Sequence, residues 1–278
     1  MEHSEPLHIL LTNDDGHQAP GIQTLHRILI QSGHRVSVVA PSTEQSATSM
    51  GVTSRRNLIL QQHEVNSWHL DGQPADTVLV ALRHLLEDNP PDLVLSGINF
   101  GPNVGTALYM SGTIGAAIMA SLNGVPAIAI SAGMRFEEVG TPFPSTHEVL
   151  EPAAEFTCSV VDSLRSSIGA SGRLLPKEIM LNINYPALPR DQIKGVLHPE
   201  ISAGHLIDLG YHRCDETGHV VPRFYPGVDP AQPNKEEGDV RAHLEGYITI
   251  SAIKPRWNPS AKQAKKLRKR MGALGLGF

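Results

Sequence analysis

The sequence predicts an α/β protein built on a doubly wound, parallel β-sheet. Short apolar runs of strand length alternate with segments whose apolar residues recur at helical spacing. The apolar runs carry no alternating polar residues, so helices should cover both faces of each strand. With right-handed crossovers, the loops that follow the strands emerge at one edge of the sheet.

Three rounds of this pattern fill the first half of the chain. A strand is predicted over 7–11, and it ends at the turn-forming run Asn13-Asp14-Asp15-Gly16. The helix that follows covers 20–33 and leads to a strand over 36–40. The two later rounds each pair a helix with a strand, namely 74–86 with 92–96 and 111–122 with 126–131.

The second half of the chain shows the pattern more weakly. A helix over 148–164 and a strand over 179–183 complete a core that spans 7–190. A strand over 246–252 returns to this core.

Two segments lie outside that core. Residues 191–245 are rich in Pro, Gly, His and charge, which indicates an irregular excursion with hairpin strands near 207–211 and 220–225. Residues 253–278 form a C-terminal arm whose helix is predicted over 259–271. We expect 1–278 to be a single domain, because no strong linker interrupts it.

Composition excludes several classes of protein. The 23 Lys and Arg residues are outnumbered by 28 Asp and Glu residues, and the net charge of -5 argues against dedicated nucleic-acid binding. Cys158 and Cys214 have no spacing typical of a metal site, redox motif or disulfide framework, which suits a reducing compartment. No apolar stretch reaches the length of a membrane span, and no basic leader precedes the first strand. A cytoplasmic protein without a membrane segment is expected.

Asp14 and Asp15 are the first candidate site residues. They follow the first strand, where open α/β sheets bind ligands. Hard carboxylate oxygens without organised Cys or His favour Mg²⁺ or Mn²⁺ over Zn²⁺. The 14 histidines are scattered, with no paired spacing at this site. The same residues also fit an Asx turn with solvated carboxylates.

Three more loops should emerge at the same edge of the sheet. Residues 40–49 are rich in hydroxyl groups, and 96–105 contain glycines for close backbone approach and two asparagines for ligation or hydrogen bonding. Ser111-Gly112-Thr113 opens a helix, whose free N–H groups can bind an anion or can simply be capped by Ser111. Carboxylates, amides and a helix N-terminus together describe a site for a metal ion and a phosphate. No P-loop or dinucleotide-binding motif is present.

At this point the residues resemble those of the SurE family of stationary-phase survival nucleotidases. The matching motifs are Leu10-Leu11-Thr12-Asn13-Asp14-Asp15-Gly16, Ala19-Pro20-Gly21, Ala40-Pro41 with Ser46, Ser96-Gly97-Ile98-Asn99, Gly101-Pro102-Asn103 and Tyr109-Met110-Ser111-Gly112-Thr113. Segments 72–78 and 245–250 also resemble the family. Two departures are His17, where relatives more often carry an aliphatic residue, and residues 200–240, which follow the family pattern poorly.

The resemblance implies a Rossmann-like, three-layer α/β/α core with a mostly parallel sheet. It also implies a C-terminal hairpin and helix extension that builds homodimers or homotetramers. The implied activity is hydrolysis of nucleoside 5′-monophosphates, and also of 3′-monophosphates, with one divalent ion per subunit, Mg²⁺ or Mn²⁺. No stable nucleic-acid complex and no membrane association are implied.

The resemblance also assigns residues to roles. By matched position, the metal ligands are Asp14, Asp15, Ser46 and Asn99. The phosphate and substrate set is Asn13, Ala47, Asn103, Ser111, Gly112 and Thr113.

Phosphate monoester hydrolysis needs a large reduction of its barrier, on the order of 20 kcal/mol or more. A helix terminus contributes at most about 2 kcal/mol to a nearby charge. A divalent ion can neutralise charge and activate water, so we give it the central role. Our hypothesis makes Asp14 the general base, Asp15 the firmer metal ligand, and Asn103 a catalytic donor to the developing charge.

Two other classes of function fit parts of the sequence. A nucleotide-binding or sensing protein of the same fold would keep the helix N-terminus and bind ligand without releasing phosphate. An RNA-associated protein would use the basic residues of the last helix, although such a face is more often solvated or part of a subunit contact. These basic residues are Lys262, Lys265, Lys266, Arg268, Lys269 and Arg270.

Overall fold

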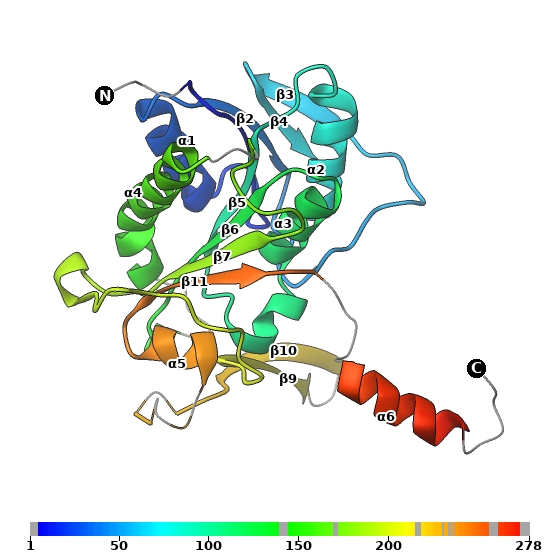
Figure 1. Ribbon diagram of the computed structural model, residues 1–278, viewed down its shortest axis with the longest axis vertical. Helices are drawn as coiled ribbons and strands as arrows, with labels where there is room; N and C mark the ends of the chain where they lie inside the picture. Colours follow the sequence, from blue (N-terminus) through cyan, green and yellow to red (C-terminus); the bar gives the residue numbers. More distant parts are fainter. Residues whose placement is uncertain are drawn as a thin grey trace.

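Figure 1 shows the computed structural model, which describes residues 5–138, 144–168, 172–214, 218–229, 231–232, 235, 237–255 and 261–272. A nine-stranded sheet runs through its centre. In spatial order its strands are β3 (Leu60–Glu64), β4 (Ser67–Leu70), β2 (Arg35–Pro41), β1 (His8–Thr12), β5 (Leu93–Phe100), β6 (Ala127–Ala132), β7 (Met180–Tyr185), β11 (Ile248–Ile253) and β8 (Val196–Leu197).

The sheet is mostly parallel, as the sequence predicts. All neighbouring pairs from β4 to β7 run parallel, whereas β3 is antiparallel to β4 and β11 is antiparallel to β7. β1 lies between β2 and β5, so the direction of winding reverses at β1. Loops that leave the carboxyl ends of strands beside such a reversal form the usual ligand crevice of these folds.

Helices cover both faces of the sheet and complete three layers (Figure 1). α1 (Pro20–Gln31) and α4 (Pro144–Ser166) pack on one face, and α2 (Pro74–Val80), continued by a π-helical turn (Ala81–Leu85), packs with α3 (Gly112–Leu122) on the other. A hydrophobic core lies on each face of the sheet. Successive residues of β1 lie in one core and then in the other, because side chains of a strand alternate between faces. Ile9 and Leu11 lie in the core under α1 and α4, and Leu10 lies in the core under α2 and α3.

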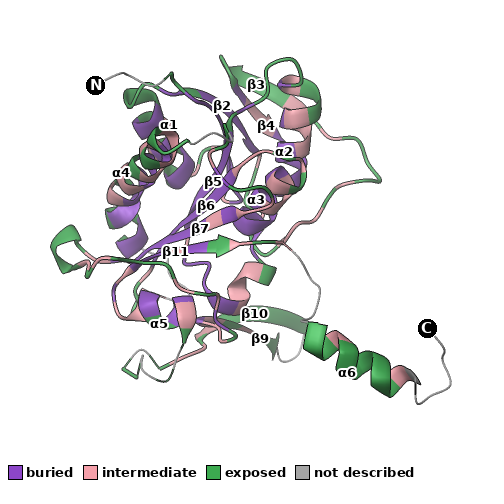
Figure 2. Ribbon diagram, in the orientation of Figure 1, coloured by how far each residue is buried: buried purple, intermediate pink, exposed green. Residues whose placement is uncertain are grey.

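The rest of the described chain lies beyond the last strands of the sheet. β9 (Ile207–Cys214) and β10 (His219–Pro226) form a separate antiparallel hairpin, and α5 (Gly238–Leu244) precedes β11. Short 3-10 turns cover Gly105–Tyr109, Phe136–Glu138 and Arg190–Gln192. α6 (Ala261–Gly272) extends away from the sheet, and both it and the hairpin are largely exposed in Figure 2. The predicted start of the last helix, at 259, lies outside the described residues.

Two features of the fold differ from the expectation. β3 and β4 extend the sheet at an edge where no strand is predicted from the sequence, because β3 is polar and almost wholly exposed and β4 has only four residues. On α3 the predicted apolar stripe is only partly buried. Ile114 is buried, whereas Leu122 is 60% exposed, and the rest of the buried face consists of small residues such as Ala116, Ala117 and Ala120.

Among the described helices, none combines the length and the apolar character needed to cross a lipid bilayer.

Candidate active site

The candidate site lies at the carboxyl end of β1, where the winding of the sheet reverses. Asn13, Asp14 and Asp15 follow directly after the last residue of β1. The loop after β2 reaches this turn, because the Gln45 N–H donates a 2.7 Å hydrogen bond to the carbonyl of Asp14 and the His17 N–H donates one of 2.9 Å to the carbonyl of Pro41. The topology therefore brings two of the four predicted loops together at the aspartates.

The start of α3 packs on the side chain of Asp14. The hydroxyl of Thr113 donates a 2.6 Å hydrogen bond to Oδ1 of Asp14, which is buried. A Cβ added at Gly112 would lie 2.9 Å from both Cβ and Oδ2 of Asp14, closer than carbon atoms normally approach. Glycine is therefore the only residue that lets this helix terminus come so close to the carboxylate.

Asp14 and Asp15 are two carboxylates that make each other costly to ionise. Burial raises the pKa of Asp14, and the hydrogen bond from Thr113 opposes this rise. Burial raises the pKa of Asp15 to about 8, with further contributions from the charge of Asp14 and then of Glu44. The only hydrogen bond to the Asp15 carboxylate among the described residues is a long one, 3.4 Å, from the N–H of Phe100.

The donor set at this turn suits a divalent cation. Across the described ranges, no Lys or Arg forms an ion pair with Asp14 or Asp15. Two further oxygens nearby, Oδ1 of Asn13 and Oγ of Ser96, are buried without a hydrogen-bond partner in the described part of the chain. Ser96 lies opposite Thr12 in the pairing of β5 with β1. A cation coordinated by hard oxygens would offset the buried negative charge and satisfy such atoms.

Asn99 and Ser46 were the other expected metal ligands. Asn99 is buried near the end of β5, and its Nδ2 donates a 2.7 Å hydrogen bond to the carbonyl of Gly101, so its Oδ1 is the atom left for a ligand. Ser46 is exposed, one residue after the Gln45 amide that contacts Asp14. Ala47 follows with a φ of 60°. Their coordination of a metal stays a prediction.

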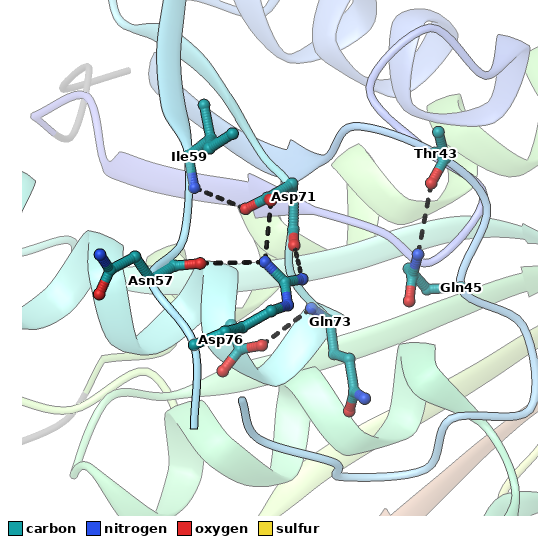
Figure 3. Close-up of polar contacts among 8 residues, drawn as sticks. Thr43, Gln45, Asn57, Ile59, Asp71, Gln73 and Asp76 are labelled. Atoms are coloured by element: carbon teal, nitrogen blue, oxygen red, sulfur yellow. Dashed lines mark hydrogen bonds and ion pairs between the residues drawn. The ribbon is translucent and has the colours of Figure 1, made fainter. Parts of the chain in front are cut away.

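The segment after Ser46 is anchored by two carboxylates, Asp71 and Asp76 (Figure 3). Asp71 accepts hydrogen bonds from the Ile59 N–H, at 2.6 Å, and from Arg56, at 2.8 Å. Asp76 accepts from the N–H groups of Thr53 and Gln73, both at 2.9 Å. These bonds hold residues 53–59, which follow the loop that carries Ser46, against residues 71–76.

Asn103 has an orientation that the sequence did not predict. Its Nδ2 donates a 2.9 Å hydrogen bond to Oγ of Ser131, and its backbone N–H donates one of 2.7 Å to Oδ1 of Asn184. Its carbonyl accepts a 2.8 Å hydrogen bond from Nδ2 of Asn182. The side chain is thus held against β6 and β7, and a role toward phosphate stays a prediction.

Ser111 caps α3 in the ordinary way, because its hydroxyl accepts a 3.2 Å hydrogen bond from the Ile114 N–H. In the described structure the N–H of Thr113 donates to the carboxylate of Asp14, which leaves the N–H of Gly112 for an anion. Beside this terminus lies a cavity of about 400 Å³, lined by Met50, Tyr109, Ile118 and Ile201 among others.

Sequence reasoning missed several residues of this region. Thr113 was expected to bind phosphate, whereas its hydroxyl contacts Asp14. Glu44, Ser131, Asn182 and Asn184 carried no motif, and only the folded chain brings them close. A small group of imidazoles was also missed. The ring of His17 stacks on that of His69 with centroids 4.4 Å apart, and His63 lies 5.2 Å from His17.

Comparisons with known proteins agree with the motifs. A family model described as survival protein SurE matches residues 9–206. The chain is 41% identical over 254 residues to a 5'-nucleotidase SurE of Carboxydothermus hydrogenoformans, covering 89% of this chain and 90% of the relative. It is 33% identical to a 5'-nucleotidase SurE of a Synechococcus strain, covering 98% of this chain and 100% of the relative. The crystal structure of the SurE protein from Aquifex aeolicus superposes with a TM-score of 0.73 at 29% identity, covering 94% of this chain and 99% of that one.

Proposed function

This chain belongs to the survival protein SurE family, and from that premise we propose that it is a 5'-nucleotidase, a metal-dependent phosphomonoesterase that converts nucleoside monophosphates to nucleoside and phosphate. One observation carries the proposal. Two adjacent carboxylates, the buried Asp14 and the partly buried Asp15, have no cationic partner in the described structure, and the N-terminus of α3, where a phosphate can bind, packs on Asp14.

We assign one divalent ion, Mg²⁺ or Mn²⁺, to Asp14, Asp15, Ser46 and Asn99. The oxygen-only donor set and the unpartnered oxygens of Asn13 and Ser96 support this assignment. When bound, such an ion polarises a phosphoryl oxygen and lowers the pKa of a water molecule.

The protein's own residues supply binding, orientation and proton transfer. The phosphate binds at the positive end of α3, where the N–H of Gly112 can donate to it, because the N–H of Thr113 donates to the carboxylate of Asp14. Asp14 orients the attacking water and takes its proton, with the Thr113 hydroxyl holding the carboxylate in place. Asn13, Ala47 and Ser111 border the substrate, and the cavity beside Tyr109 offers an apolar surface to the nucleoside. Asn103 turns its amide from Ser131 to the phosphate when substrate binds.

The active assembly is a homodimer or homotetramer built through the C-terminal elements. The exposed apolar residues of the hairpin support this proposal, because Tyr211, Val220 and Phe224 are each more than half exposed. Leu267 on α6 is 54% exposed. Light scattering should find an oligomer, and a stable monomer at all concentrations would contradict it. A cytoplasmic location stays a prediction from the sequence.

The activity is tested by phosphate release from nucleoside 5′-monophosphates, nucleoside 3′-monophosphates and p-nitrophenyl phosphate. Protein treated with EDTA should be inactive, and Mn²⁺ or Mg²⁺ should restore turnover. Binding of nucleotide without phosphate release under any metal would favour the sensing protein instead.

A further inference from the structure

A second cluster of metal-ligating side chains lies at the opposite edge of the sheet from Asp14. His34 directly precedes β2, at the amino end of that strand, whereas Asp14 follows the carboxyl end of β1. One donor atom each from His34, Cys158 and Asp162 lies within 4.8 Å of the other two. Cys158 and Asp162 are four residues apart on α4, which places them on the same face of the helix.

His34 is buried without the hydrogen bonds that a buried imidazole normally makes. Its side chain is 0% exposed, and neither ring nitrogen has a hydrogen-bond partner among the residues that the structure describes. Its Nε2 lies 3.6 Å from Oδ1 of Asp162. A buried polar group without a hydrogen bond destabilises a folded protein, so the buried imidazole of His34 indicates that a ligand binds at this position.

We propose that His34, Cys158 and Asp162 form a second metal site, which takes Zn²⁺ and joins the end of α1 to α4. A nitrogen, a sulfur and an oxygen ligand form a donor set typical of zinc, and the oxygen-only site at Asp14 is not. The carboxylate of Asp162 is 43% exposed, so the site opens to solvent on that side and leaves room for a water ligand.

The protonation states of His34 and Cys158 determine whether a proton must leave when zinc binds. Burial lowers the pKa of His34, so the imidazole is neutral, which is the form that binds metals. Burial raises the pKa of the Cys158 thiol. Zinc must therefore displace the thiol proton: the S–H bond breaks, the S–Zn bond forms, and the proton leaves to solvent.

Arg165 competes with the metal. Its Nη2 lies 2.9 Å from the same Oδ1 of Asp162 that faces His34. Zinc binding requires Arg165 to release this oxygen, so replacing the arginine should tighten the site. The variant Arg165→Gln is expected to bind zinc more tightly than the wild type, by about fivefold if one ion pair of roughly 1 kcal/mol is removed.

Cobalt is the probe that separates this site from the catalytic one, because only a sulfur ligand gives thiolate-to-cobalt charge-transfer absorption in the near ultraviolet. The full-length protein carries Asp15→Asn, is kept reduced, stripped with EDTA and titrated with Co²⁺. The band should appear, saturate at one equivalent, and vanish when Zn²⁺ is added, since zinc binds such ligands more tightly. The melting temperature should rise with Zn²⁺.

Matched variants test each ligand. The band should be lost in Cys158→Ser and kept in Cys214→Ser, which removes the other thiol.

Asp162→Asn changes a half-exposed side chain and so tests the site without endangering the fold. It should weaken Co²⁺ binding by at least the roughly 10–100-fold that loss of a supporting partner costs. A band absent from the parent protein, or unchanged in Cys158→Ser or Asp162→Asn, overturns the proposal. The test measures metal binding and not phosphate release. The result of the test is therefore independent of the proposed nucleotidase activity.

Discussion

The hydroxyl of Thr113 and the carboxylate of Asp14 are joined by a hydrogen bond of 2.6 Å, which links the start of α3 to the end of β1. Short hydrogen bonds to ionised oxygen are stronger than neutral ones. This bond lowers the pKa of Asp14 against the rise caused by burial. It therefore both orients the carboxylate and favours the charged form that a base or a metal ligand needs.

Thr113→Val should weaken catalysis by raising the pKa of Asp14. The variant keeps the shape of the side chain and removes the donor. We expect the acid limb of the pH profile of kcat/KM to move to higher pH. A loss of about 1.5–3 kcal/mol in stability is also expected. Thr113→Ser, which retains the hydroxyl, should behave as the wild type. An unmoved acid limb in Thr113→Val would remove the bond from the mechanism.

Gly112→Ala should disable the site without unfolding the protein. The new methyl group would lie 2.9 Å from Cβ and Oδ2 of Asp14, so the carboxylate must move. A displacement of about 1 Å in such a site can lower the rate by roughly 10²-fold. Gly124→Ala is the control: it has a φ of 83° and open space around it, so it should cost roughly 1 kcal/mol of stability and leave kcat unchanged. Equal kcat values for the two variants would contradict the argument.

Asn103→Ala should be folded and nearly inactive. Loss of a donor to developing charge usually lowers kcat by about 10²–10³-fold. In this structure Nδ2 of Asn103 lies 2.9 Å from Oγ of Ser131. Ser131→Ala therefore tests whether this hydrogen bond holds the Asn103 side chain in place when no substrate is bound. We expect Ser131→Ala to change KM more than kcat. Near-normal turnover of Asn103→Ala would exclude this residue from catalysis.

His243 should make the protein less stable as the pH falls. Burial lowers the pKa of this histidine to about 4, from 6.5 in the unfolded chain. Between these values the unfolded state binds the proton and the folded state does not, so stability falls as the pH falls through this window. The full loss of unfolding free energy, reached below the folded pKa, amounts to about 3 kcal/mol.

Urea unfolding at neutral and mildly acidic pH measures this effect. The free energy of unfolding should depend less steeply on pH in His243→Gln than in the wild type, with the exposed His84→Gln as control. The same pH dependence of stability in His243→Gln and in the wild type would contradict this prediction.

The main sheet and the aspartate pair could be predicted from the sequence because their signals are local. Val36 to Ala40 and Ala127 to Ser131 are continuous apolar runs, and Asp14 and Asp15 follow a strand directly. β3 could not be predicted, because it is a polar, exposed edge strand without the apolar pattern of a buried strand.

Partners of the candidate site depend on tertiary contacts that no local pattern encodes. Thr113 and Asp14 are distant in sequence, and so are Asn103 and Asn184. Spacing could not connect Cys158 with His34, which approaches it from the loop before β2. For such residues the sequence supplies the donor atoms, and the packing of α1, α3 and α4 decides which of them meet.

The most direct test of the account compares metal binding and phosphate release in Asp15→Asn and in the exposed control Asp191→Asn. Each folded protein is stripped with EDTA, titrated with Mn²⁺ by calorimetry, and assayed with a nucleoside 5′-monophosphate. We predict that Asp191→Asn binds Mn²⁺ and releases phosphate as the wild type does, and that Asp15→Asn loses both. Undiminished Mn²⁺ affinity and turnover in Asp15→Asn would contradict the claim that the carboxylate pair after β1 holds the catalytic metal.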